Sequence, residues 1–277
     1  MRLLGNYIGV ILGLLAMNVN KEKLADLLAV ICLVSIGFSY SLWAKDLFIG
    51  KSVFFALASM LPSILYLSLR KIKDWKKIFI SVILFGLFFQ SLFDFFQIAN
   101  NSYILTSTIA PLLFGIMPLD IFVWDVLMVT FTLIFYQHFF KDKTDYKVSP
   151  RIKYFIPALI LVLILVLLYK PIFSSFINSY AYLGLFAIIP ALILVIRRSW
   201  LVRNTIYASS FFFFFYLGIE LIGLHNQQWI FPGNYIAKIS LIGYRFPLEE
   251  LFFWMIFYVP SLIGCYELFI EPKHKHK

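Results

Sequence analysis

Charged residues are scarce in this chain. They account for 14% of its 277 residues, whereas a soluble globular domain carries about 25%. Acidic residues are the rarer kind, with 14 Asp and Glu against 24 Lys and Arg. So few ionised side chains, together with 62% hydrophobic residues, exclude an ordinary water-soluble fold and predict a protein that resides in a lipid bilayer.

The chain also lacks the motifs of several enzyme classes. No GxxxxGK[ST], GxGxxG or HExxH occurs, so nucleotide, dinucleotide and zinc-protease sites have no sequence signature here. No DxxxD or DDxxD cluster is present to hold magnesium and a diphosphate, which argues against prenyl transfer. Cys32 and Cys265 lie in apolar segments without metal-ligand spacing, and we interpret them as small core residues. We therefore expect neither a metal ion nor a redox cofactor.

What the chain has instead is a series of apolar segments that approach the ~20 residues needed to cross a membrane. They are Leu3–Val19, Leu24–Ala44, Leu47–Leu69, Ile78–Ala99, Pro118–Phe140, Tyr154–Tyr169, Phe176–Ile196, Thr205–Gly223 and Pro247–Ile270. The sequence thus predicts an all-α polytopic membrane protein with about nine transmembrane helices.

Basic residues gather in four clusters, at 70–77, 141–153, 197–203 and 273–277. With the spans above, all of them lie on one side of the membrane, which the positive-inside rule makes cytoplasmic. We therefore expect an integral protein of the cytoplasmic membrane of a prokaryote, with its C-terminus in the cytoplasm. The net charge of +10 then indicates loops that face anionic lipid, and we expect no nucleic-acid partner.

The chain divides into two similar halves after its first span. In each half, a proline-acid motif opens the last span, after a polar and aromatic loop. Each half has an even number of spans, so the two four-helix repeats should be parallel, and a site is expected between them. The domains are a transmembrane anchor (1–23), a degenerate first repeat (24–140), a basic cytoplasmic linker (141–153) and a second repeat with a basic tail (154–277).

The proline-acid motifs are Pro118-Leu119-Asp120 and Pro247-Leu248-Glu249-Glu250. An ionised side chain inside a bilayer costs roughly 2.5–3.5 kcal/mol on insertion scales, so these acids are functional candidates. Neighbouring residues of a helix point about 100° apart, so Glu249 and Glu250 do not face the same point. One would address a cavity while the other orients it or pairs with Arg245. The alternative is that each motif simply starts a helix at the water interface.

Two further acids, Asp94 and Glu220, stand at matching places late in the span before each polar loop. Each is either a functional carboxyl or an interfacial charge. In the second half, Glu220 is followed by Trp229, by Gly243 and then by the run Pro247–Phe253, which reads PLEELFF. This series resembles the small integral-membrane lycopene cyclases of the heterodimeric or fused type. Members of that family carry an acid, a tryptophan loop, a glycine and a Pro-x-Glu-Glu motif in each repeat.

The first half departs from the family pattern, since Pro118-Leu119-Asp120-Ile121 replaces Pro-x-Glu-Glu and Asn100-Asn101-Ser102-Tyr103 replaces the tryptophan loop. Asp94 and Gly115 keep the acid and glycine positions, and Glu220 stands where aspartate is usual. The resemblance implies cyclisation of a linear carotenoid, in which a terminal double bond is protonated, a ring closes and a proton is lost. It implies no cofactor.

On this resemblance, Glu249 or Glu250 is the acid, with the other as partner or base. Asp120 is the equivalent in the first half, and Glu220 or Asp94 assists. Residues expected to shield the cation and contact the substrate are Phe252, Phe253, Trp254, Trp229 and Trp124, with ordinary packing as the alternative. The expected partner is a lipid-soluble carotenoid or isoprenoid. Both halves lie in one chain, so no cyclase partner subunit is obligatory, and a homodimer is compatible with this organisation.

Two rival functions remain. A related enzyme would quench the same cation with water, or act on an isoprenoid of another length, with nearly the same residues. A transporter or lipid-binding membrane protein would use the same scaffold without catalysis, because a fold does not dictate a function.

Overall fold

The protein is described here by a computed structural model. The residues it describes are 21–47, 51–70, 72, 74–113, 115–140, 146–148, 161, 179–268 and 270–272. Most of them are helical, and the strands are short and paired two by two. The expected predominance of helices is confirmed in this part of the chain.

The first half contains α2 (Lys21–Trp43), α3 (Ser52–Ser68), a continuous helical segment made of α4 (Trp75–Ser81), η2 (Val82–Gln90) and α5 (Ser91–Ala99), and then α6 (Asp120–Phe140). The second half contains α9 (Ser179–Arg197), the short η3 (Ser199–Leu201), α10 (Val202–His225), η4 (Glu250–Ile256) and α11 (Tyr258–Leu268). Both η2 and η4 are π-helical. Such wider turns occur often at functional sites.

Five helical segments are long and apolar enough to cross a membrane, namely Lys21–Trp43, Trp75–Ala99, Asp120–Phe140, Tyr180–Arg197 and Ser199–His225. They confirm that the chain is a membrane protein with several apolar helices. The predicted span Leu47–Leu69 contains the shorter helix α3, and Pro247–Ile270 contains η4 and α11. Leu3–Val19 lies outside the described residues, as does Tyr154–Tyr169 except for residue 161.

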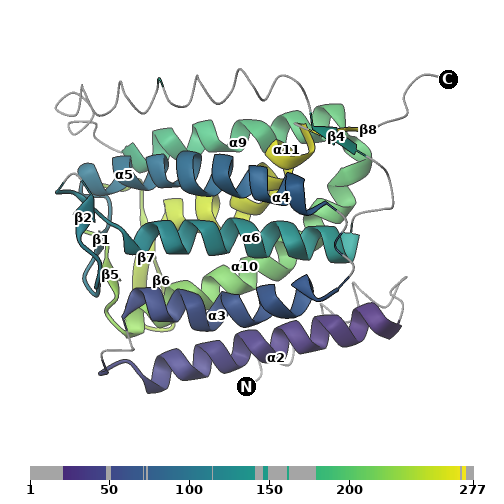
Figure 1. The fold of residues 1–277 in the computed structure, drawn as a ribbon. Coiled ribbons are helices and arrows are strands. Elements are labelled where there is room, and N and C mark those ends of the chain that lie inside the picture. Colours follow the sequence, from purple (N-terminus) through teal and green to yellow (C-terminus); the bar gives the residue numbers. More distant parts are fainter. Residues whose placement is uncertain are drawn as a thin grey trace.

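The helices lie side by side in a bundle, and the connecting strands are divided between its two ends (Figure 1). One end carries β1 (Ile104–Leu105), β2 (Leu112–Leu113), β3 (Met117–Pro118), β5 (Trp229–Ile230), β6 (Lys238–Leu241) and β7 (Tyr244–Pro247). The opposite end carries β4 (Tyr146–Val148), which pairs with β8 (Ile270–Pro272).

The loop end joins the two halves of the chain. β1 pairs with β5 in antiparallel register, with Ile104 opposite Ile230 and Leu105 opposite Trp229. The backbone ladder therefore ties the loop after α5 to the loop after α10. Other strands at this end form local hairpins, β2 with β3 and β6 with β7.

Phenylalanine fills the centre of the bundle. The run of Phe residues at 211–215 lies on α10, and Phe211 stacks on Phe135 of α6 with ring centroids 4.4 Å apart. Phe131 meets Phe212 edge to face at 5.1 Å. Offset and edge-to-face contacts of this kind add to the packing energy of buried rings. The rings thus join α6 to α10 and fix two of the helices that carry the site.

Candidate functional site

A cavity of about 170 Å³ lies among the helices η2, α5, α6, α9, α10, η4 and α11. Its walls are mainly aromatic and aliphatic. It extends from Leu105 and Trp229 at the loop end to Leu262 and Cys265 on α11. Glu250 and Cys265 both line it, and the chain between them corresponds to roughly 22 Å of helix. The cavity therefore runs along the bundle beside η4 and α11.

Four carboxyl groups line this apolar cavity. They belong to Asp94 on α5, Asp125 on α6, Glu220 on α10 and Glu250 at the start of η4. Each lies within five residues of the helix end that faces the β1–β5 loops. Asp125, Glu220 and Glu250 are only 1%, 3% and 7% exposed. The carboxyls therefore gather at one end of the cavity, away from bulk water.

The acids of the first half form one hydrogen-bonded group. Gln90 Nε2 donates to Asp94 Oδ2 over 3.4 Å, and Ser91 Oγ lies 2.6 Å from Asp125 Oδ2. Asp94 is also hydrogen-bonded to Asp125 and to the hydroxyl of Tyr103. The contact between Ser91 and Asp125 joins α5 to α6, so helix packing brings the two aspartates together.

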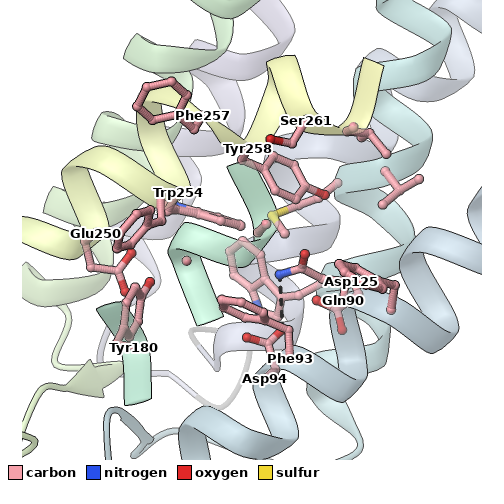
Figure 2. A pocket seen from close by; sticks show the side chains of 18 of the residues that line it. Gln90, Phe93, Asp94, Asp125, Tyr180, Glu250, Trp254, Phe257, Tyr258 and Ser261 are labelled. Atoms are coloured by element: carbon pink, nitrogen blue, oxygen red, sulfur yellow. Dashed lines mark hydrogen bonds between the residues drawn. The ribbon is translucent and has the colours of Figure 1, made fainter. Parts of the chain in front are cut away.

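The acids of the second half each have an aromatic partner. Trp229 Nε1 donates to Glu220 Oε1 over 3.2 Å, and the side chains of Tyr180 and Glu250 are hydrogen-bonded. Figure 2 shows Glu250 and Tyr180 on one side of the cavity, with Gln90, Asp94 and Asp125 on the other. Glu250 therefore faces the two aspartates across a space walled by aromatic rings, and Glu220 lines the same cavity.

Asp120 and Glu249, the first acids of the two proline-acid motifs, occupy a different position. Neither lines the cavity. Asp120 Oδ2 accepts the backbone N–H groups of Ile109 at 2.9 Å and Ala110 at 3.3 Å. Glu249 Oε1 accepts the N–H of Ile236 at 2.6 Å. Each carboxyl therefore anchors the loop that precedes its own helix.

Four of the five expected aromatic residues line the cavity: Trp124, Trp229, Phe253 and Trp254. Trp124 and Trp229 meet edge to face at 6.0 Å across the two halves. Phe252 does not line the cavity, and it is 43% exposed.

The loops that follow α5 and α10 share one backbone pattern. Asn100 N and Asn226 N bond to the carbonyls of Phe96 and Ile222, each four residues earlier. The next residues, Asn101 and Gln227, both adopt positive φ, at 54° and 53°. The third residues, Ser102 and Gln228, donate to Gln97 O and Gly223 O. Tyr103 and Trp229 then occupy equivalent places, and each reaches the acid of its own half, Asp94 or Glu220.

Sequence reasoning missed Asp125, Gln90, Tyr180 and Tyr258 as cavity residues. Asp125 lies inside an apolar helix, where a single aspartate is itself a signal because of its insertion cost. Gln90 precedes Asp94 by one helical turn, a spacing that allows their contact. The two tyrosines are not distinguishable in sequence from the other aromatic residues.

No protein-family model, curated protein or solved structure matches this chain. Among the described residues, no group of three or more His, Cys, Asp and Glu side chains is arranged to hold a metal ion.

Proposed function

We propose that this protein is a membrane-embedded, non-redox cyclase that forms an end ring on a linear carotenoid or a related isoprenoid. The observation that carries the proposal is the position of four carboxyl groups in a mainly apolar, aromatic cavity of a membrane protein. The apolar walls suit a hydrocarbon, and the carboxyls are groups that can give and take a proton. The resemblance of Glu220, Trp229 and PLEELFF to lycopene cyclases supports the same reaction.

The shape of the cavity supports a linear substrate. Its walls follow η4 and α11 from Glu250 to Cys265, which suits part of an extended chain with one end beside the acids. Trp124, Phe253 and Trp254 present ring faces or edges to the same space. A carbocation within about 6 Å of an aromatic face is stabilised by the ring quadrupole. The rings also exclude water, which would otherwise trap the cation.

The proposed reaction returns every proton that it uses. A carboxyl O–H bond breaks as its proton is transferred to the terminal double bond, whose π electrons form the new C–H bond. The tertiary carbocation that results is attacked by a neighbouring double bond, which supplies the electrons of the ring C–C bond and carries the charge to the next tertiary carbon. A carboxylate removes a proton from an adjacent carbon, and the C–H electrons form the ring double bond. Substrate and product have equal mass, and no oxidant or reductant is consumed.

The positions of the acids suggest a division of roles in this reaction. Glu250, Glu220 and Asp94 line the cavity and are the candidates for proton transfer. Glu249 and Asp120 bind backbone N–H groups of the preceding loops, and we assign them the positioning of those loops over the cavity. Of the two adjacent glutamates, Glu250 is thus the one that exchanges protons and Glu249 is its support.

The proposal includes the nine-span, two-repeat topology. Three observations support it: the shared pattern of the loops after α5 and α10, the prolines at 62 and 190 inside α3 and α9, and the packing of α3 on α6 and of α9 on α11. The acids lie at the end opposite Arg70 and Arg198. With the basic end in the cytoplasm of a prokaryote, ring closure takes place near the outer face of the membrane.

The test is expression in a host that accumulates lycopene, followed by chromatography of the pigments with mass detection. We expect a ringed product with the mass of lycopene, and its loss in the Glu250→Gln variant. Asp46→Asn is the matched control, because Asp46 is exposed and lies outside the cavity. Unchanged lycopene beside well-expressed, membrane-inserted protein would contradict the use of lycopene as substrate.

A hydratase is the second candidate, favoured by two hydroxyl groups of the cavity. Tyr258 and Ser261 line it, and neither hydroxyl has a hydrogen-bond partner among the described residues. Figure 2 shows both side chains beside the cavity. They have free hydrogen-bonding capacity for a water molecule that would attack the cation. A product heavier than lycopene by one water would identify this reaction.

A further inference from the structure

Asp125 lies outside both proline-acid motifs, yet it is the cavity carboxyl with the smallest exposed fraction, 1%. Its neighbours come from the adjacent helix α5. Ser91 Oγ lies 2.6 Å from Asp125 Oδ2, and Asp94 is hydrogen-bonded to Asp125. Figure 2 shows the side chains of Asp94, Asp125 and Gln90 close together at the cavity.

The hydrogen-bonding capacity of this group favours one proton held between the two aspartates. Two ionised carboxylates only accept hydrogen bonds, so the contact between Asp94 and Asp125 requires a proton on one of them. Ser91 Oγ lies 3.1 Å from Gly86 O as well as 2.6 Å from Asp125 Oδ2, but a hydroxyl has one hydrogen. In the shorter of these contacts Ser91 Oγ donates to Asp125 Oδ2, so the bond between Asp94 and Asp125 needs a proton of its own.

The acids of the second half are bonded to separate aromatic donors rather than to each other. Trp229 Nε1 donates to Glu220, and an indole N–H is a donor only. The hydroxyl of Tyr180 is bonded to Glu250. Each glutamate thus has a neighbour able to donate a hydrogen bond to an ionised carboxylate, which suits a group that accepts a proton.

We propose that Asp94 and Asp125 share one proton and form the acid of the reaction, while Glu220 and Glu250 across the cavity form the base. This assignment rests on the proposed cyclase function. Asp94 is the proton donor, and Asp125 is a positioning residue that holds the shared proton in place. In each turnover the proton moves from the aspartate pair to the less substituted carbon of the terminal double bond, which leaves a tertiary carbocation on the other carbon. The ring proton moves to a glutamate, and exchange between the groups or with water restores both pairs. Each repeat therefore supplies one half of a single site.

Infrared spectroscopy of the purified protein tests the shared proton without any substrate. A protonated carboxyl has a C=O stretching band that an ionised carboxylate lacks, and the band shifts in heavy water. We expect one such band to be lost or shifted in Asp94→Asn and also in Asp125→Asn. Ser91→Ala, which keeps both carboxyls but removes the 2.6 Å contact, should shift the same band. Asp46→Asn, at an exposed position, should leave it unchanged.

Conversion of lycopene provides the second measurement. General acid catalysis contributes about 10²- to 10⁴-fold, so Asp94→Asn should slow conversion by at least about 100-fold. Asp125→Asn should slow it by about tenfold or more, and Asp125→Glu should recover part of the rate. A band that responds to only one aspartate, or an Asp125→Asn variant with the wild-type rate, would overturn the inference.

The two measurements distinguish a failure of the cyclase proposal from a failure of the shared-proton proposal. If the wild-type protein forms no ring but the C=O band responds to both aspartate variants, the shared proton is supported and the cyclase function is contradicted. If the wild-type protein forms the ring but the C=O band is unchanged in Asp125→Asn, the cyclase function is supported and the shared proton of Asp94 and Asp125 is contradicted. If Asp125→Asn does not fold, Ser91→Ala decides: a shifted band supports the pair, and an unchanged band contradicts it.

Discussion

The indole of Trp229 lies against Gly223, in the space that a Cβ atom at position 223 would occupy. This close approach lets Trp229 Nε1 reach Glu220 Oε1 at 3.2 Å. The missing side chain at position 223 therefore allows a loop residue to hold an acid of the cavity in place.

Gly223→Ala should displace the indole and break its hydrogen bond to Glu220. We expect conversion of lycopene to fall by about tenfold or more, with a loss of stability of about 1–3 kcal/mol from overpacking. Trp229→Phe keeps a ring but removes the donor, so it should slow conversion with a smaller loss of stability. The measurements are pigment analysis and thermal unfolding in detergent. A Gly223→Ala variant with the wild-type rate would show that the Trp229–Glu220 contact does not matter for activity.

The two adjacent glutamates should respond differently to the same substitution. Glu250→Gln removes a proton-exchanging carboxyl from the cavity, and conversion should fall by about 100-fold or more. Glu249→Gln keeps a side-chain oxygen that can accept the N–H of Ile236, so conversion should stay within about tenfold of the wild type. Both variants are compared at equal amounts of membrane-inserted protein. A greater loss in Glu249→Gln than in Glu250→Gln would reverse the assigned roles.

The hairpin between β6 and β7 offers a test of local strain. Leu241 pairs with Tyr244, so Ile242 and Gly243 form a two-residue turn, with φ of 51° and 83°. Positive φ at both positions favours Asn-Gly, and it is costly for β-branched isoleucine. Ile242→Asn should raise the free energy of unfolding by about 1 kcal/mol, and Gly243→Ala should lower it by a similar amount. Thermal unfolding measures both, and a destabilised Ile242→Asn protein would indicate that the exposed Ile242 contributes more by its contacts than it costs by its backbone.

On the proposed topology, the basic end of the bundle lies in the cytoplasm and the acids lie near the outer face of the membrane. In a variant with Cys32 and Cys265 replaced by alanine, Asn234→Cys should react with a membrane-impermeant thiol reagent in intact cells. Arg203→Cys should react only after the cells are opened, because the positive-inside rule places it in the cytoplasm. Both positions are exposed, so accessibility within the protein does not separate them. The reverse labelling pattern would place the acids on the cytoplasmic side.

The helical segments were predictable because hydropathy is a local property. The apolar runs Leu24–Ala44 and Pro118–Phe140 coincide with α2 and α6 to within a few residues. Asp94 and Glu220 were also identifiable, because each precedes a polar loop at a matching place. Asp125 is a sequence signal as a lone aspartate in an apolar helix, but its contact with Ser91 was not predictable, since it depends on the packing of α6 against α5. Long-range packing of this kind leaves no local pattern.

The adjacent glutamates illustrate a second limit of prediction from sequence, the direction in which a side chain points. Helical geometry predicts that Glu249 and Glu250 diverge, but their directions depend on the loop that returns over the helix start and on the π-helical turn η4. Phe252 shows the same effect, because it lies on the exposed side of η4 while Phe253 and Trp254 line the cavity. Sequence spacing gives the angles between side chains, and tertiary contacts decide which of them points inward.

The position of the carboxyls has a consequence for a substrate with two reactive ends. All four acids lie within five residues of the loop end of their helices, and the cavity continues past them toward Cys265. Only one terminus of a symmetric polyene can therefore reach the acids at a time, while the remainder of the molecule occupies the deeper cavity or the lipid. The second terminus becomes reactive only after the molecule has left, turned end for end and entered again. On the proposed cyclase function, the protein would thus be distributive, and a singly ringed compound would build up first and be released before any doubly ringed compound forms.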